Sequence, residues 1–103
     1  MLFGTRQKVR DSDMWQERTE LLLNPEQMDR LHNAHIAVIG LGGVGAYAAE
    51  MLARASVGSL LILDSDNVSV SNRNRQLLAL KSTTGRPKTE VMAERLLDIN
   101  PDL

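Results

Sequence analysis

Two short, continuous apolar runs dominate the hydrophobic pattern of the chain. They cover His35–Gly40 and Ser59–Leu63, and their length and composition predict strands buried inside a sheet. The segment between them, Ala46–Ala55, is rich in small residues and predicts a helix. Its expected packing positions are Tyr47, Met51 and Leu52. Two buried strands joined by a helix indicate a βαβ unit, in which the strands run parallel.

The chain before the first strand is predicted to contain two helices. Met1–Asp13 is polar and unpatterned, and we interpret it as a flexible leader. Trp15–Leu23 has helical character. Asn24 and Pro25 are typical of the cap and the first position of a second helix, which we expect to end near Asn33.

The chain after the second strand is predicted to alternate between loops and helices. Ser65–Asn74 has the composition of a polar loop, and Arg75–Leu80 predicts a short helical piece. Thr84–Pro87 interrupts the chain and begins a last helix, which Asn100-Pro101 ends. That helix carries an apolar stripe, formed by Val91, Met92, Leu96 and Ile99.

The order of these elements predicts the α/β fold class. We expect a Rossmann-like parallel sheet, of which the chain forms the N-terminal βαβ part of a doubly wound nucleotide-binding domain. Two strands are too few for a stable sheet, and the sequence ends at Asn100–Leu103, where a third strand would begin. We therefore expect residues 14–103 to be the incomplete N-terminal part of a longer domain.

Composition excludes several classes of site. The chain has 103 residues, no cysteine and a formal net charge of −1. Disulfides, thiolate zinc sites and a cysteine nucleophile are excluded within it, and no metal site is expected among its residues. The apolar runs are shorter than a membrane span, and the N-terminus lacks the apolar core of a secretory signal. A cytoplasmic location without a membrane partner is expected.

A glycine-rich turn follows the first apolar run directly. Gly40, Gly42, Gly43 and Gly45 fit the pattern G-x-G-x-x-G with one added glycine. Glycines at such a turn let the backbone approach a ligand closely, and the helix that follows presents free N–H groups to an anion. The motif alone is weak, because a glycine-rich turn is sometimes only a tight connection. In this context it indicates a phosphate-binding turn.

Asp64 closes the second apolar run. It follows Gly40 at close to the spacing of about 20 residues at which an acidic residue reaches a ribose hydroxyl in dinucleotide-binding folds. A carboxylate can accept hydrogen bonds from two neighbouring hydroxyls. The alternative for Asp64 is a turn-forming role, which is the favoured interpretation for Asp66.

A polar cluster and a lysine follow along the chain. The cluster contains two arginines, two amides and a hydroxyl, and its candidate phosphate-binding members are Ser71, Asn72, Asn74 and Arg75. Lys88 falls in the first turn of the last helix, where the helix dipole disfavours a cation, so we expect it to act on a ligand. The alternative for Lys88 is an exposed side chain without a role.

These side chains are expected to meet at one edge of the sheet, because ligands of open α/β sheets bind beyond the carboxyl ends of the strands. A nucleotide with its ribose on Asp64 and its phosphates near Arg75 and Lys88 fits this arrangement. The P-loop pattern is absent. An NAD-dependent Rossmann oxidoreductase and a non-catalytic oligomerising fragment remain as alternatives. The second phosphate-binding cluster argues against the oxidoreductase.

Five ordered motifs resemble the adenylating domain of the ubiquitin-activating-enzyme-like superfamily. They are Gly40-x-Gly42-Gly43-x-Gly45, Leu63-Asp64-x-Asp66-x-Val68, Ser71-Asn72-x-Asn74-Arg75-Gln76, Gly85-x-Pro87-Lys88 and Ile99-Asn100-Pro101. The superfamily includes the bacterial thiamine and molybdopterin sulfur-carrier adenylyltransferases. Within it, the loop sequence and the helix Glu90–Arg95 are most similar to the tRNA threonylcarbamoyladenosine dehydratases.

The resemblance implies adenylation of a carboxylate with ATP. The glycines would line the nucleotide, Asp64 would hold the ribose, and Asn72, Arg75 and Lys88 would hold the triphosphate. It also implies a homodimer in which Arg18 reaches the partner's site, and Mg²⁺ bound by an aspartate beyond Leu103. The implied substrate is tRNA, and the alternative is a ubiquitin-like sulfur-carrier protein.

Overall fold

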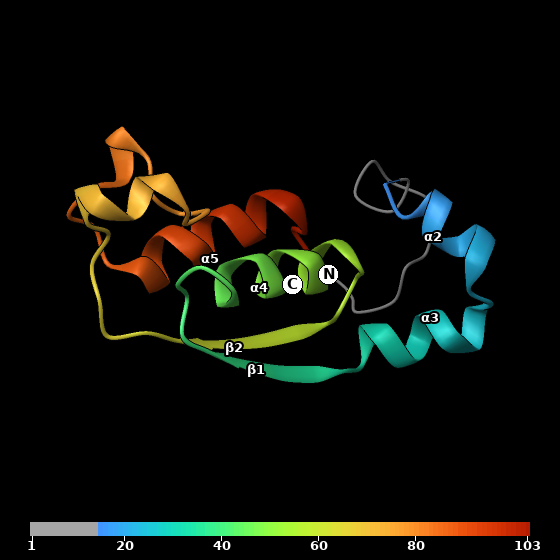
Figure 1. The fold of residues 1–103 in the computed structure, drawn as a ribbon. Coiled ribbons are helices and arrows are strands. Elements are labelled where there is room, and N and C mark those ends of the chain that lie inside the picture. Colours follow the sequence, from blue (N-terminus) through green and yellow to red (C-terminus); the bar gives the residue numbers. More distant parts are fainter. Residues whose placement is uncertain (1–14) are drawn as a thin grey trace.

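The computed structural model describes residues 15–103, so the predicted leader lies outside the described residues. The helices are α2 (Glu17–Leu22), α3 (Pro25–His32), α4 (Gly45–Arg54) and α5 (Lys88–Ile99), and the strands are β1 (His35–Ile39) and β2 (Ser59–Leu63). Two short 3₁₀ turns, η1 (Val70–Asn74) and η2 (Lys81–Thr83), lie between β2 and α5. Figure 1 shows these elements in chain order, with α2 and α3 at one end of the molecule.

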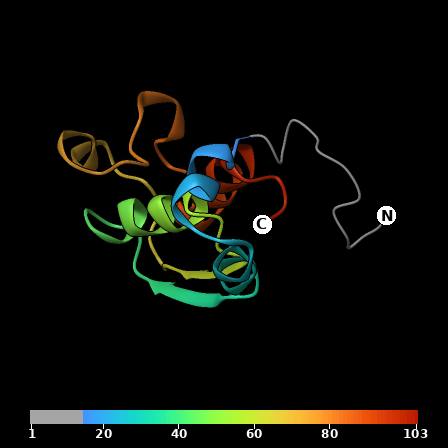
Figure 2. The same ribbon diagram turned by 90° about the vertical axis from the view of Figure 1, so that its right-hand side faces the viewer.

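The two strands form a parallel pair joined through α4, so the predicted βαβ unit is confirmed. The register runs from His35 opposite Ser59 to Ile39 opposite Leu63. Helices α4 and α5 both lie on one face of this sheet, as Figures 1 and 2 show from two sides. Both strands therefore end at the same edge of the sheet, where α4 begins, so the loops that follow β1 and β2 lie close together.

The core lies between the sheet and the two helices. Small residues on one side of α4 let it pack closely on its neighbours: Ala46, Ala49 and Ala53 are fully buried. The other members of the core cluster are Val38, Leu41, Val68, Leu78, Ala79, Val91, Met92 and Leu96. Three of the four residues of the predicted stripe on the last helix belong to this core.

Polar contacts also join α4 to α5. Glu50 of α4 is buried and pairs with Arg54, at 3.1 Å, and with Arg95 of α5. The hydrogen bond from Arg95 keeps the pKa of Glu50 below its ordinary value, against the opposing effect of burial. At the end of α5, the side-chain amide of Asn100 donates to the carbonyl of Ala53, 3.3 Å away. These contacts fix the direction of α5, and with it the position of its N-terminus.

The predicted start of α3 is confirmed in atomic detail. The side-chain oxygen of Asn24 accepts from the N–H of Gln27, and the side-chain oxygen of Gln27 accepts from the N–H of Asn24, both at 2.9 Å. Pro25 occupies the first helical position, where no N–H is needed. Within residues 15–103, no helix combines the length and the apolar character needed to cross a membrane.

The expectation that both strands are buried is wrong for one face of the sheet. Val38 is buried, but Ile39 is 79% exposed and Leu61 is 58% exposed. Successive side chains of a strand point to opposite faces, and the described helices cover only one of them. The continuous apolar sequence of the strands suits a sheet that is covered on both sides.

Two further expectations are corrected. Tyr47 and Met51 are exposed, because α4 turns its alanines toward the core, and Leu52 alone of the three expected residues packs against it. Arg75–Leu80 is not helical, and the helical turns lie on either side of it. The hydroxyl of Thr83 accepts from the N–H of Leu80, at 2.9 Å, so a side chain satisfies the backbone there in place of a helix.

Candidate nucleotide-binding site

The candidate residues gather where the strands end and the helices begin. The loops after β1 and β2, the turns η1 and η2, and the N-termini of α4 and α5 all lie at the same end of the molecule (Figure 1). This is the edge at which open α/β sheets bind ligands. The structure therefore brings the glycine-rich turn, Asp64 and Lys88 into one region, as the sequence predicts.

The glycine-rich turn needs glycine for different reasons at different positions. Gly40 has a φ of +93°, which side chains rarely adopt. A Cβ on Gly45 would stand 1.7 Å from the carbonyl oxygen of Gly40, so α4 begins in contact with the end of β1. A Cβ on Gly43 would meet nothing within 4 Å. Within the described residues, the N–H groups of Gly42 and Gly43 donate to no acceptor, which leaves them free for an anion.

Asp64 holds the two loops together. Its carboxylate accepts from the N–H of Leu41, in the glycine-rich turn, and from the N–H of Asp66, both at 2.7 Å. The alternative structural role of Asp64 is therefore observed, and its ribose role stays a prediction. Each carboxylate oxygen can accept more than one hydrogen bond, so ribose hydroxyls can be added to the two N–H groups.

The charge of Asp64 is stabilised where it lies. Partial burial raises the pKa of the carboxyl group, but the N–H groups of Leu41 and Asp66 and the nearby charge of Lys88 outweigh it. The pKa therefore lies below the ordinary value of 3.8. Asp64 stays ionised under all physiological conditions.

Acid is expected to weaken the fold through this group. Because the folded-state pKa of Asp64 is lowered, its contribution to stability is fully present above the unfolded value and is lost as the pH falls through the folded value. The pKa of Glu50 is also lowered, from its ordinary value of 4.5, so protonation of Glu50 destabilises the fold in acid as well. We expect the free energy of unfolding, measured by urea titration, to fall between about pH 5 and about pH 3.

The variant Asp64→Asn tests whether the ionised carboxylate of Asp64 stabilises the fold. It is expected to lose about 2 kcal/mol of stability at neutral pH, the usual effect of a hydrogen bond to a charged group, and to show a flatter pH dependence. Asp29→Asn is the matched control, because Asp29 is exposed on α3 and its side chain makes no hydrogen bond within residues 15–103. Equal pH dependence in wild type and Asp64→Asn would contradict the assignment.

Backbone hydrogen bonds fix Lys88 beside Asp64. The N–H of Lys88 donates to the carbonyl of Asp66, at 3.0 Å, and the N–H of Val68 donates to the carbonyl of Arg86, at 2.9 Å. The N–H of Gly85 in turn donates to the carbonyl of Val68, at 2.8 Å. The chain that follows β2 is thus paired with the chain that enters α5, and the start of α5 cannot move independently of Asp64.

Lys88 is buried, and its ammonium group is not paired. The residue is only 5% exposed, and it makes no ion pair or side-chain hydrogen bond with any other described residue. Its charge acts on Asp64 from a distance. The alternative of an exposed lysine is wrong, and the role of Lys88 toward a ligand stays a prediction. The side chain of Lys88 is packed along its length and its charge has no partner among residues 15–103, so a bound anion would complement it.

The cluster after β2 is exposed and contains its own hydrogen bonds. One guanidinium nitrogen of Arg75 donates to Asn74 Oδ1, at 2.9 Å, and to the carbonyl of Ser71, at 3.3 Å. Asn72 Oδ1 accepts from the N–H of Ser69, at 2.9 Å, and so caps η1. The remaining guanidinium nitrogens of Arg75 and the amide nitrogen of Asn72 make no hydrogen bond with another residue of the range 15–103.

Arg18 does not join the site within this chain. It is exposed on α2, and α2 lies at the end of the molecule opposite the glycine-rich turn (Figure 1). Gln76 does join the site, although the sequence motif did not assign it a role. Its side-chain nitrogen lies 3.7 Å from the place where a Cβ on Gly42 would stand. Only its place in the motif, directly after Arg75, could have indicated this.

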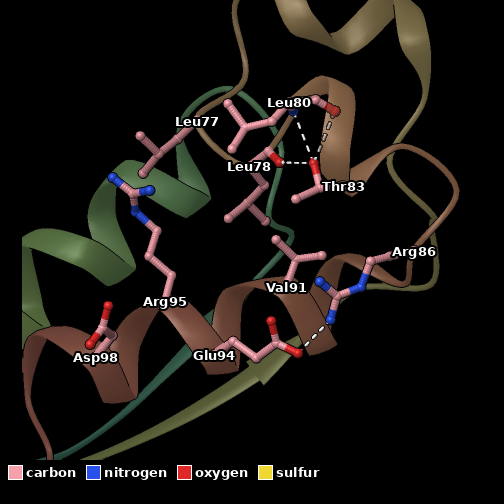
Figure 3. A pocket seen from close by; sticks show the side chains of 9 residues that line it. All are labelled: Leu77, Leu78, Leu80, Thr83, Arg86, Val91, Glu94, Arg95 and Asp98. Atoms are coloured by element: carbon pink, nitrogen blue, oxygen red, sulfur yellow. Dashed lines mark hydrogen bonds and ion pairs between the residues drawn. The ribbon is translucent and has the colours of Figure 1, made fainter.

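A separate pocket of about 280 Å³ lies between α5 and the segment that contains η2 (Figure 3). Its lining is apolar at Leu77, Leu78 and Val91, and Arg86 at its edge is paired with Glu90 and Glu94. These ion pairs keep the pKa of Glu94 low and raise that of Arg86. Because the charge of Arg86 is already matched, this pocket is a poorer phosphate site than the region around Lys88.

The family is decided by comparison with known proteins. Residues 16–103, the range that contains the whole site, match the ThiF family. The chain belongs to this family. The resemblance to the adenylating superfamily is thereby confirmed.

Three relatives show how close the similarity is. The chain is 51% identical over 85 residues to the tRNA threonylcarbamoyladenosine dehydratase of Bacillus subtilis, covering 82% of this chain and 34% of that protein. It is 39% identical to the molybdopterin-synthase adenylyltransferase of Salmonella typhimurium, covering 93% of this chain and 40% of that protein. The crystal structure of the E. coli tRNA N6-threonylcarbamoyladenosine dehydratase in complex with ATP superposes with a TM-score of 0.81 at 45% identity, covering 91% of this chain and 40% of that one.

These comparisons confirm the α/β, Rossmann-type fold of this ThiF family chain. The chain spans about a third of the length of the curated dehydratases that it matches. The relatives are adenylating enzymes and tRNA dehydratases by name, which favours the adenylation hypothesis over an NAD-dependent oxidoreductase.

Proposed function

We propose that the protein activates a carboxylate by adenylation with ATP, and that residues 14–103 are the N-terminal part of its ATP-binding domain. The observation that carries the proposal is Lys88, a buried residue whose charge has no partner among residues 15–103 and acts on Asp64 at the edge of the sheet that holds the glycine-rich turn. One cation without a partner, free N–H groups and a carboxylate at one site match the phosphates and the ribose of a nucleotide.

The reaction begins with attack of the substrate carboxylate on the α-phosphate of ATP. It forms an acyl-adenylate and releases pyrophosphate. Gly40, Gly42, Gly43 and Gly45 line the nucleotide, Asp64 accepts from the ribose, and Ser71, Asn72, Asn74, Arg75 and Lys88 contact the triphosphate. Negative charge that develops at the α-phosphate is stabilised by Arg75 and Lys88, so catalysis rests on positioning and electrostatics.

We propose the threonylcarbamoyl group on an adenosine of tRNA as the carboxylate. The support is the 51% identity to the dehydratase of Bacillus subtilis and the ATP complex of the E. coli dehydratase. The activated carboxyl is attacked from within the same group, which closes a ring and releases AMP, so that the substrate has lost the elements of water. The reaction is placed in the cytoplasm, where ATP and tRNA meet.

The second candidate is adenylation of a ubiquitin-like sulfur-carrier protein. The 39% identity to a molybdopterin-synthase adenylyltransferase favours it. Both reactions use the same first step, so the nucleotide site does not separate them.

Substrate-dependent exchange of labelled pyrophosphate into ATP tests the function. With the full-length protein, we expect tRNA that carries threonylcarbamoyladenosine to stimulate the exchange at least tenfold, and unmodified tRNA to have no effect. Stimulation by a sulfur-carrier protein in place of tRNA would establish the second candidate. Absence of ATP binding would overturn both.

Mg²⁺ accompanies ATP in this proposal, but the described residues do not form a site for it. No group of three His, Asp or Glu side chains among residues 15–103 could hold a metal ion. Asp64, the carboxylate at the site, is already bonded to two N–H groups. We therefore assign Mg²⁺ no ligand in this segment.

Arg18 is proposed to act in a homodimer. It is exposed and lies at the end of the chain opposite the site. From there it can meet a nucleotide only in a second copy of the protein, where its guanidinium would pair with a phosphate.

A further inference from the structure

The side chain of Gln76 lies against the glycine-rich turn in an unusual state. Its Nε2 is 3.7 Å from the place of a Cβ on Gly42. Its Oε1 is fully buried and has no hydrogen-bond partner among the described residues. Buried carboxamide oxygens in proteins nearly always have a partner, so this one needs an explanation.

The backbone of Gln76 is well fixed. Its N–H donates to the carbonyl of Asn72, at 2.9 Å, and its carbonyl accepts from the N–H of Ala79, at 3.1 Å. Leu78 and Ala79, which follow directly, are buried in the core. The carboxamide is therefore presented from a rigid segment, unlike the exposed side chains of Asn74 and Arg75 just before it.

Packing alone does not explain an amide at this position. An apolar side chain of similar length would fill the same space without leaving a buried acceptor unpaired. On the other side of the contact, the N–H group of Gly42 also has no acceptor among the described residues. Unpaired polar groups on both sides of one contact are expected where a ligand or a ligand-induced shift completes the hydrogen bonds.

We propose that Gln76 is a positioning residue for the phosphate-binding turn. Its carboxamide sets the position of Gly42 and orients the free N–H groups of the turn toward the phosphates of the nucleotide. When a nucleotide is bound, a donor of the turn pairs with Gln76 Oε1. This role rests on the proposed function, because it needs a nucleotide at the turn.

Equilibrium binding of ATP and of adenosine to the full-length protein tests this role. Gln76→Met keeps the length of the side chain and removes its hydrogen bonds. We expect its Kd for ATP to rise about tenfold, as for the loss of one hydrogen bond that orders the turn, with the melting temperature unchanged or raised. Gln76→Glu adds a negative charge beside the phosphates, so we expect a larger rise for ATP and a small one for adenosine.

A double-mutant cycle tests whether Gln76 acts through Gly42. Gly42→Ala places a methyl group at ordinary contact distance from Gln76 Nε2, and it needs no unusual φ. We expect Gln76→Met to add less than twofold to the loss in Gly42→Ala, but its full effect in Gly43→Ala, where the methyl group meets nothing. If Gln76→Met does not fold, Gln76→Glu replaces it in the same cycle.

The outcomes separate this role from the proposed function. If Gln76→Met binds ATP within twofold of wild type while Lys88→Met does not bind it, the role of Gln76 is overturned and the nucleotide site stands. If Lys88→Met binds ATP as wild type does, the proposed function itself is overturned. Full additivity of Gln76→Met with Gly42→Ala would overturn the action through Gly42.

Discussion

Lys88→Met is expected to abolish ATP–pyrophosphate exchange while leaving the fold intact. Lys88 is 5% exposed, and its ammonium group has no partner within residues 15–103. Methionine retains most of the volume of the packed side chain and removes its charge, so the fold is expected to stay intact. Removal of one preorganised charge from a reacting group typically costs about 100- to 1,000-fold in rate.

Lys81→Met is the matched control for this variant. Lys81 lies on η2, is exposed and makes no ion pair with another described residue, so its variant is expected to exchange pyrophosphate as wild type does. Arg75→Ala is expected to lose exchange as Lys88→Met does. Wild-type exchange in both Arg75→Ala and Lys88→Met would remove the basis for adenylation at this site.

Gly45→Ala is expected to be the most damaging small substitution in the glycine-rich turn. The added Cβ would lie 1.7 Å from the carbonyl oxygen of Gly40 and 2.8 Å from its carbonyl carbon. Both are backbone atoms at the end of β1, so no flexible side chain can move aside. We expect a loss of about 3 kcal/mol or more, or failure to fold, because overpacking against backbone forces α4 away from the sheet.

Gly43→Ala, two positions earlier, is the control for stability. Its Cβ would meet nothing within 4 Å, so we expect a change below about 1 kcal/mol. Urea titration of the two variants beside wild type makes the comparison. Equal stability of Gly45→Ala and Gly43→Ala would mean that α4 does not begin against the end of β1.

The sequence predicts those parts of the fold that depend on local chemistry. The cap at Asn24, the strand Ser59–Leu63 and the helix that begins at Lys88 all follow from residue types and their spacing, and all are confirmed. The prediction of a helical piece over Arg75–Leu80 is wrong for a physical reason. Its leucines and alanine favour a helix, but burial of Leu78 and Ala79 and the contacts of Thr83 hold the chain in another conformation.

The sequence predicts which residues form the candidate site, but not how tertiary packing buries them or brings them into contact. The glycine pattern, Asp64 and Lys88 are visible in the sequence, and the parallel sheet brings them to one edge. The burial of Lys88 depends on the pairing of the chain after β2 with the chain before α5, which no local pattern encodes. The contact of Gln76 with Gly42 is likewise a product of tertiary packing. The residue roles stay predictions until the variants are measured.

The carboxylate of Asp64 shapes how this region can change during evolution. It binds the backbone N–H groups of Leu41 and Asp66, and not their side chains. The identity of residue 66 can therefore drift without a compensating change at position 64, while residue 41 is constrained only by its burial in the core. Position 64 itself has little freedom, because glutamate is one methylene too long and asparagine replaces one acceptor oxygen by a donor. A single side chain, supported by the backbone hydrogen bond from Gly40 to Leu63, thus orders the two loops without a matched pair of side chains.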